Sequence, residues 1–387
     1  KNPPFPRNFA QELLVLERGE GVYLIDEAGK RYLDFGSGIS VNALGYGRED
    51  LASIAYRQMQ KLIHISNLYA NKPALELAWK MTRSLGFDAV QFGNSGSEAN
   101  ETAIKFARLY AYRTKGPGHH RIICFSNAFH GRTLGALSCT PTAKYQDPFR
   151  PLVPDVEVCP FGDAEALKAL FDDRVAAVIT EVVQGEGGLG TMTEDFAALI
   201  NELAEKNDSI VIADEVQTGL GRCGYLTASE INGLKPDIIS LAKPLAGGLP
   251  LSATLVPKRI NELLALGEHG TTFGGGPVAS AVASHVWDRL SDPAFLKEVR
   301  EKGAYLSSSL AELCGERMPF SELRGVGMLR GLRMRKPEDL PDLMNRAREA
   351  GLLVLRSGTD VLRIAPPLII EKEEIDQGLK ILKKLIN

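Results

Sequence analysis

A lysine and an aspartate each follow a short apolar segment. Lys243 ends Asp237-Ile-Ile-Ser-Leu-Ala-Lys243, and Asp214 ends Ile210-Val-Ile-Ala-Asp214. If both segments are strands of one sheet, they present an amine and a carboxylate at the same edge. Pyridoxal phosphate needs such a pair, because a lysine forms a Schiff base with its aldehyde and an acid keeps its ring nitrogen protonated. Taken singly, either residue also fits an ordinary strand-end or surface charge.

A serine- and glycine-rich turn predicts an anion site. Asn94-Ser-Gly-Ser-Glu-Ala-Asn100 joins an expected strand to an expected helix, and Gly96 and Ser97 would expose backbone N–H groups there. The helix dipole adds positive potential, which favours a phosphate. Simple capping of the helix by Ser95 or Ser97 is the alternative. The position at the carboxyl end of a strand favours a ligand, because open α/β sheets bind ligands there.

The segment Phe129-His-Gly-Arg132 follows another expected strand. An aromatic ring at the end of a strand can stack on a flat cofactor, and an arginine can bind a carboxylate with two hydrogen bonds. On these residues alone, Phe129 as a core residue and Arg132 as a surface charge fit equally well. The motif therefore adds a binding hypothesis that depends on the others.

A glycine-rich segment raises a rival interpretation. Gly185-Glu-Gly-Gly-Leu-Gly190 satisfies the Gly-x-Gly-x-x-Gly pattern of dinucleotide-binding proteins. However, Thr191-Met-Thr separates it from the next expected helix, and Glu186 would repel a pyrophosphate. A nicotinamide-dependent dehydrogenase is therefore the weaker enzyme hypothesis. A non-catalytic binding protein on a similar fold is the third.

Composition limits the partners that can be expected. The chain has 387 residues, 44% hydrophobic and 24% charged, with a net charge of −3. This predicts two or three globular domains, without nucleic acid or a membrane as the main partner. The five cysteines include no Cys-x-x-Cys pair, which favours reduced thiols and a cytoplasmic location. The histidine spacing predicts no metal site.

The elements that must position these residues follow from the hydrophobic pattern. Short apolar segments alternate with helical patterns at 97–114, 164–171 and 194–206, which predicts a parallel sheet covered on both faces. Leu251–Val256 follows a turn too short for a crossover helix, so an antiparallel strand is expected there. Residues 22–35 predict a hairpin, and the chain after residue 276 predicts an α+β segment. The expected parallel strands begin at Ala89, Ile122, Val175, Ile210 and Ile238.

Taken together, these motifs resemble the class III (subgroup II) aminotransferases of pyridoxal phosphate fold type I, and within that class the acetylornithine aminotransferases. The resemblance extends over nearly the whole chain. Its motifs include Gly38-Ile-Ser-Val-Asn-Ala-Leu-Gly, Asn94-Ser-Gly-Ser-Glu-Ala-Asn-Glu101, Ala128-Phe-His-Gly-Arg-Thr133, Asp214-Glu-Val-Gln-Thr-Gly219, His269-Gly-Thr-Thr-Phe-Gly-Gly275 and Leu362-Arg-Ile-Ala-Pro-Pro367.

The resemblance implies a fold and a set of cofactor contacts. A large domain, 51–275, would hold a mostly parallel seven-stranded sheet, and a small domain would combine 1–50 with 276–387. Lys243 would bind pyridoxal 5'-phosphate and move the proton, and Asp214 would pair with the ring nitrogen. The protein would be a homodimer with shared active sites. The other implied contacts are Phe129 and Val216 on the ring faces, Gln217 on the phenolic oxygen, Gly96 and Ser97 on the phosphate, and Thr272 on the phosphate of the neighbouring subunit's cofactor.

The resemblance also implies the substrates. Arg363 would bind the carboxylate next to the reacting carbon of glutamate, Arg132 the distal carboxylate, and Glu186 would neutralise Arg363 when a terminal amine is bound. The expected reaction moves the terminal amino group of N-acetylornithine to 2-oxoglutarate, in arginine biosynthesis. Ornithine, succinylornithine, succinyl-diaminopimelate and 4-aminobutyrate stay open as donors.

Overall fold

The apolar segments of the sequence form one seven-stranded sheet in the computed structural model, which describes residue 6 and residues 14–386. The strand order is β4-β10-β9-β8-β7-β5-β6, and every pair is parallel except the two that β10 makes. The expected α/β fold with a mostly parallel sheet is confirmed, as is the antiparallel strand. The strands are β4 (Ala89–Gly93), β5 (Arg121–Phe125), β6 (Val156–Cys159), β7 (Val175–Thr180), β8 (Ile210–Asp214), β9 (Ile238–Leu241) and β10 (Ser252–Val256).

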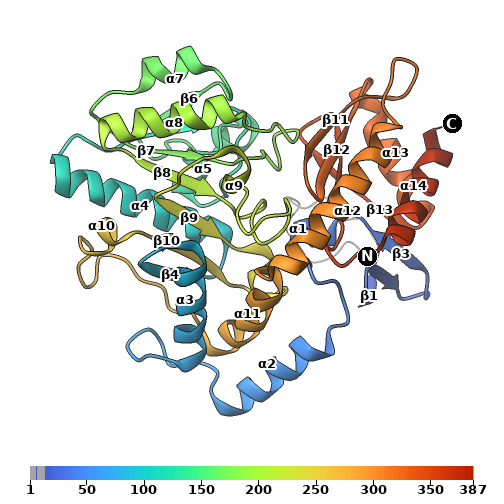
Figure 1. Ribbon diagram of the computed structural model, residues 1–387, viewed down its shortest axis with the longest axis horizontal. Coiled ribbons are helices and arrows are strands. Elements are labelled where there is room, and N and C mark those ends of the chain that lie inside the picture. The colour runs from blue at the N-terminus through green and yellow to red at the C-terminus, as the bar shows by residue number, and fades with distance from the viewer. Residues whose placement is uncertain (1–5, 7–13, 387) are drawn as a thin grey trace.

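Helices cover both faces of this sheet (Figure 1). Successive strand residues point to opposite faces. Val178 and Val211 therefore pack in the core that includes α8 (Glu194–Asn207), and Ile179 and Ile212 in the core that includes α4 (Gly96–Lys115). All residues of β7 and β8 are buried, which explains why their sequences are almost wholly apolar.

The register of the central strands brings the two candidate catalytic residues to one edge. Asp214 is the last residue of β8 and lies opposite Ser240 of β9. Lys243 comes three residues after Ser240, just beyond the end of β9. Parallel pairing thus places the carboxylate and the amine at the same end of the sheet.

Two smaller sheets contain the remaining strands. One has the order β1-β2-β3-β13 and the other β11-β12-β15-β14. The parallel pair of β3 and β13 joins an early segment of the chain to a late one, and the predicted hairpin is the antiparallel pair β2–β3. The division into domains at 50/51 and 275/276 stays a prediction. These strands are β1 (Leu16–Glu20), β2 (Tyr23–Asp26), β3 (Arg31–Asp34), β11 (Phe320–Val326), β12 (Leu329–Met334), β13 (Leu352–Leu353), β14 (Leu355–Ser357) and β15 (Val361–Ile364).

The helical segment after residue 276 is two helices, because Asp292 and Pro293 begin a new one. The Asp292 side chain accepts a hydrogen bond from the Ala294 backbone N–H, and Pro293 occupies the first turn, where its missing N–H costs nothing. The other helices include α2 (Glu49–Lys61), α3 (Lys72–Leu85), α5 (Leu134–Ser138), α6 (Ala143–Gln146), α7 (Ala164–Leu170), α9 (Ser229–Asn232), α10 (Lys258–Asn261), α11 (Pro277–Leu290), α12 (Pro293–Ala311), α13 (Leu340–Glu349) and α14 (Lys372–Ile386).

The turn α1 (Ser37–Ser40) fixes the segment that enters the pocket described below. All four of its residues have positive φ, a backbone conformation that residues other than glycine rarely adopt. The Ser37 hydroxyl donates to the Ala365 carbonyl at 2.7 Å and accepts from the buried guanidinium of Arg222 at 3.2 Å. These bonds hold Val41, which follows the turn, against the pocket.

Candidate active site

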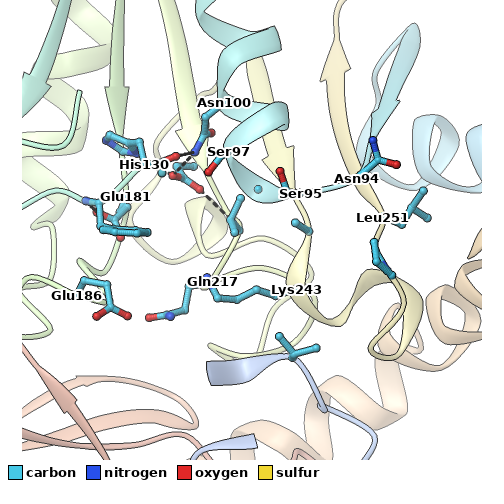
Figure 2. Close-up of a pocket in the computed structure, with 18 of the residues that line it drawn as sticks. Asn94, Ser95, Ser97, Asn100, His130, Glu181, Glu186, Gln217, Lys243 and Leu251 are labelled. Atoms are coloured by element: carbon cyan, nitrogen blue, oxygen red, sulfur yellow. Dashed lines mark hydrogen bonds and ion pairs between the residues drawn. The ribbon is translucent and has the colours of Figure 1, made fainter. Parts of the chain in front are cut away.

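A pocket of about 500 Å³ lies where β4, β8 and β9 end. Figure 2 shows the Lys243 amine and the Gln217 amide pointing into the same space, with Glu186 beside them. The sequence-predicted residues that line the pocket are Gly96, Ser97, Phe129, Glu186, Asp214, Val216, Gln217 and Lys243. Residues separated by almost 150 positions thus converge at one edge of the sheet.

Lys243 is held in an unusual backbone conformation. It begins a short 3-10 turn, Lys243–Ala246, and its φ of 39° lies in the left-handed region. Such a residue costs about 1 kcal/mol or more and persists where the surroundings enforce it. Burial lowers the pKa of Lys243, although the charges of Asp214 and Glu186 oppose that shift. A lowered pKa increases the fraction of neutral amine, which is the nucleophilic and basic form.

Three hydrogen bonds fix the Asp214 carboxylate. Its Oδ2 accepts from His130 Nδ1 at 2.7 Å and from Asn100 Nδ2 at 2.8 Å, and its Oδ1 accepts from the Val216 N–H at 3.0 Å. Only 4% of Asp214 is exposed. Burial by itself would lower the pKa of His130, but the hydrogen bond to Asp214 and the charge of that carboxylate outweigh it, and the pKa is raised.

His130 and Asn100 received no role from the sequence. Both stand inside quoted motifs, Phe129-His-Gly-Arg132 and Asn94–Asn100, but nothing in either motif shows that they face the same carboxylate. Asn100 also donates to the His130 carbonyl at 2.8 Å, so it joins the two motifs. Their convergence on Asp214 depends on the packing of α4 against the sheet.

Glu181 is buried and bonds to the backbone of the loop that carries Phe129. Its carboxylate accepts from the Phe129 N–H at 3.0 Å and from the Gly185 N–H at 3.1 Å. Burial raises the pKa of Glu181 to about 7, with His130 opposing the shift and Asp214 adding to it. Glu181 therefore positions two loops of the pocket, the one that carries Phe129 and the one that carries Glu186.

The N-terminus of α4 forms one end of the pocket. Ser95 caps the helix, accepting from the Glu98 N–H at 3.2 Å, and Gly96 and Ser97 begin the first turn. A Cβ atom at position 96 would lie 2.7 Å from Val216 Cγ1. The glycine therefore allows the start of the helix to approach Val216 closely and leaves the N–H groups accessible to an anion.

An ion pair closes the other end of the pocket. Arg363 on β15 donates through Nη1 to Glu186 Oε1 at 2.6 Å and to the Gly185 carbonyl at 2.8 Å. Its guanidinium is 3% exposed and its Nε has no partner among the described residues. A buried guanidinium without an opposite charge is costly, so Glu186 offsets that cost.

Three predicted residues do not line the pocket: Arg363, which pairs with Glu186 at its end, Arg132 and Thr272. Arg132 is exposed, and its guanidinium lies over the Tyr145 ring at 3.6 Å from the centroid, with the Phe129 ring at 5.4 Å. Thr272 is also exposed, in the loop that Asn67 holds by donating to the Thr271 carbonyl at 2.7 Å. Arg132 thus lies beside Phe129, whereas Thr272 is exposed and is not part of this chain's own pocket lining.

The residues present fit pyridoxal phosphate. The pocket combines an amine of lowered pKa, a carboxylate fixed by three donors, a helix N-terminus for a phosphate, and the side chains of Phe129 and Val216 for a planar ring. The described residues contain no group of three or more His, Cys, Asp or Glu side chains that could hold a metal.

Replacing Gly96 by alanine tests the close approach at the helix N-terminus. The added methyl group would displace Val216, and overpacking of this kind costs about 1–3 kcal/mol. We expect the Kd for pyridoxal phosphate to rise about fivefold or more, measured by titrating the apoprotein. Gly315→Ala is the control, because a Cβ there meets nothing closer than 3.5 Å. An unchanged Kd in the Gly96 variant would contradict the assignment.

Comparisons with known proteins agree with this chemistry. The family described as aminotransferase class-III matches residues 5–386. The chain is 45% identical over 381 residues to a probable mitochondrial acetylornithine aminotransferase of Dictyostelium discoideum, covering 96% of this chain and 83% of that protein. Across the described residues, no helix is long and apolar enough to cross a membrane.

Solved structures that resemble this chain are also aminotransferases. The ornithine aminotransferase of Toxoplasma gondii ME49 superimposes with a TM-score of 0.94 at 32% identity, covering 98% of this chain and 92% of that one. The N-acetylornithine aminotransferase of Stenotrophomonas maltophilia K279a gives 0.85 at 33% identity, with 97% and 96% covered. The chain therefore belongs to the class III aminotransferases, and it is an enzyme that depends on pyridoxal phosphate.

Proposed function

We propose that this aminotransferase moves the terminal amino group of N-acetylornithine to 2-oxoglutarate, giving N-acetylglutamate semialdehyde and glutamate in arginine biosynthesis. The observation that carries the proposal is the ion pair of the buried Arg363 with the partly exposed Glu186 at 2.6 Å. The names of the similar proteins from Dictyostelium discoideum and Stenotrophomonas maltophilia point to the same donor.

The ion pair suits an enzyme with two dissimilar amine substrates. Glutamate carries a carboxylate next to its reacting carbon, and Arg363 would bind it with Glu186 displaced. A terminal amine such as that of N-acetylornithine has no carboxylate there, and Glu186 would stay on Arg363 and keep its charge compensated. Displacement by glutamate would turn Glu186 toward solvent, to which 36% of its side chain is already exposed. Arg132 would hold the distal carboxylate of either substrate.

The other pocket residues would each have a separate role in the reaction. Pyridoxal phosphate, when bound, supplies an electron sink for the negative charge that develops on the substrate carbon. Asp214 would keep a proton on the ring nitrogen, with His130 and Asn100 fixing the carboxylate. Lys243 would hold the cofactor and, once the substrate amine displaces it, take the proton from the substrate carbon. The residues proposed to bind the cofactor are Gly96, Ser97, Phe129, Val216 and Gln217.

We also propose a homodimer in which Thr272 contributes to the partner subunit's active site. The loop of Thr272 and the segment 64–69 lie together, since the His64 and Phe273 rings are 5.4 Å apart. Both expose large apolar side chains: Leu68 is 86%, Tyr69 73% and Phe273 67% exposed. Apolar groups gathered in this way are typical of an interface. Sedimentation of the holoenzyme as a monomer would contradict the dimer. The cytoplasmic location stays a prediction.

Steady-state rates with a panel of terminal amines test the donor. With 2-oxoglutarate as acceptor, we expect kcat/KM to be highest for N-acetylornithine among N-acetylornithine, ornithine and 4-aminobutyrate. A higher value for ornithine or 4-aminobutyrate would replace the proposed donor while leaving the class of enzyme unchanged.

Glu186→Ala tests the ion pair. Without the carboxylate, Arg363 stays unpaired when a terminal amine is bound, so the ratio of kcat/KM for N-acetylornithine to that for glutamate should fall about tenfold. The two half-reactions can be followed separately by the absorbance of the bound cofactor. Glu316→Ala, at an exposed position with no ion pair in the described structure, is the control. An unchanged ratio in the Glu186 variant would contradict the proposal that Glu186 pairs with Arg363 for one substrate and is displaced for the other.

A further inference from the structure

The loop that carries Glu186 is held from one side by Glu181. The buried Gly185 N–H donates to Glu181 Oε1 at 3.1 Å. Glu186 itself is partly exposed and pairs with Arg363. The position of its carboxylate therefore depends on how the backbone before it and after it is fixed.

A buried serine outside the pocket lining holds the same loop from the other side. Ser357 ends β14 and is 0% exposed. Its hydroxyl donates to the Gly185 carbonyl at 2.7 Å and accepts from the Gly188 N–H at 2.8 Å. This single hydroxyl thus bridges the residue before Glu186 and the second residue after it.

The hairpin that supplies this serine also supplies the arginine of the ion pair. β14 pairs antiparallel with β15, the strand of Arg363. The Gly185 carbonyl accepts from Arg363 Nη1 at 2.8 Å as well as from Ser357. The Gly358 N–H donates to the Glu186 carbonyl at 2.9 Å. The hairpin therefore holds the acidic loop at the place where the ion pair forms.

We infer that Ser357 is a positioning residue that sets the substrate preference of the enzyme, because it holds the Glu186 loop in place against Arg363. The inference rests on the proposed function, in which Glu186 pairs with Arg363 for a terminal amine and is displaced by the carboxylate of glutamate. A loop fixed at Gly185 and Gly188 confines that displacement to the Glu186 side chain.

Loss of the hydroxyl should affect the two kinds of substrate unequally. The buried Gly188 N–H would lose its acceptor, which is unfavourable, so the loop would shift or admit water. Arg363 would then more often lack its counter-charge when a terminal amine is bound, whereas glutamate supplies that charge itself. The effect is partial, because Arg324 Nη1 still donates to the Gly188 carbonyl at 3.2 Å.

Ser357→Ala tests this role in the holoenzyme, with the two half-reactions followed by the absorbance of the bound cofactor. The ratio of kcat/KM for N-acetylornithine to that for glutamate should fall about three- to fivefold, less than in Glu186→Ala, because the carboxylate is moved rather than removed. Should the alanine variant not fold, Ser357→Cys decides, since a thiol bonds more weakly and a smaller fall in the ratio is expected.

Ser209→Ala is the matched control. Ser209 is also buried, and its hydroxyl donates to the Val175 carbonyl at 2.7 Å, but it precedes β8 at the end of that strand opposite to Asp214. The control should keep the wild-type ratio.

A double-mutant cycle with Glu186→Ala separates positioning from a general loss of structure. Where no carboxylate is left to position, Ser357→Ala should change the ratio by about 1.5-fold or less. An equal fall with and without Glu186 would overturn the inference. So would an equal loss of kcat/KM for both substrates with the ratio unchanged.

The cycle also keeps failure of the inference apart from failure of the proposed function. In either overturning case, a fall of the ratio in Glu186→Ala alone leaves the proposed function standing. An unchanged ratio in Glu186→Ala would remove the proposed role of the ion pair and the inference with it. If N-acetylornithine does not react while glutamate does, the proposed donor is wrong, and the cycle is measured with whichever of ornithine and 4-aminobutyrate has the higher kcat/KM.

Discussion

Replacing Lys243 by alanine is expected to lower kcat at least about 10⁴-fold, since it removes both the covalent anchor of the cofactor and the base that moves the substrate proton. The structure supports both roles, because the amine is in the pocket with a lowered pKa and Asp214 stands at the end of the neighbouring strand. Single-turnover absorbance changes with N-acetylornithine or glutamate would measure the loss. Small primary amines added to the variant should restore part of the rate.

Lys235→Ala is the matched control, since this lysine is exposed and lies before β9 rather than after it. It should retain wild-type kcat. Borohydride reduction of the wild-type holoenzyme should fix the cofactor to the peptide that contains Lys243. Label on another peptide, or a Lys243 variant that keeps more than about a tenth of the wild-type rate, would rule out this mechanism.

The central sheet could be predicted because its strands are buried on both faces. Segments such as Val175–Thr180 and Ile210–Asp214 have no polar face, so their hydrophobic runs stand out in the sequence. The edge strand Val156–Cys159 was missed for the opposite reason. It alternates apolar residues with Glu157, two of its residues are exposed, and it pairs with β5 alone.

The part of the site that consists of local sequence motifs could be predicted. The strand-end positions of Asp214 and Lys243, and the turn at Gly96, follow from short-range patterns combined with parallel pairing. The partners of Asp214 do not, since Asn100 and His130 lie 114 and 84 residues away in sequence. Only the docking of α4 and the loop after β5 determines that their side chains meet this carboxylate.

The pairing of Arg363 with Glu186 could be expected from the family resemblance but not from any local sequence pattern. These residues are 177 positions apart, on β15 and on a loop of the large sheet. No periodicity relates them, and the resemblance alone implied that they meet. The structure brings them within 2.6 Å, while the catalytic role of that contact stays a proposal.

Asp214→Asn is expected to lower kcat about 10³-fold, equivalent to about 4 kcal/mol of transition-state stabilisation, because the proposed role of the carboxylate is to keep the ring nitrogen protonated. Asparagine keeps the size of the side chain and can still accept one hydrogen bond, so the fold and the pocket should persist. The absorbance of the bound cofactor and single-turnover rates would separate loss of binding from loss of catalysis. Asp195→Asn, at an exposed position on α8, is the control.

The same substitution should change how stability depends on pH. Asp214 raises the pKa of His130 above its ordinary value of 6.5, so in the wild-type protein this pair adds stability that is fully present below that value and is lost as pH rises through the higher, folded-state pKa. In the variant, the hydrogen bond and charge of Asp214 are lost, and burial lowers the pKa of His130 against only the weaker effects of Glu181 and Cys139. The free energy of unfolding of the apoprotein, measured in urea, should therefore differ most between wild type and Asp214→Asn near pH 6 and least near pH 9. An equal difference at both pH values would mean that His130 is not coupled to Asp214, and the fixed, charged carboxylate on which the catalytic assignment depends would lose its main support.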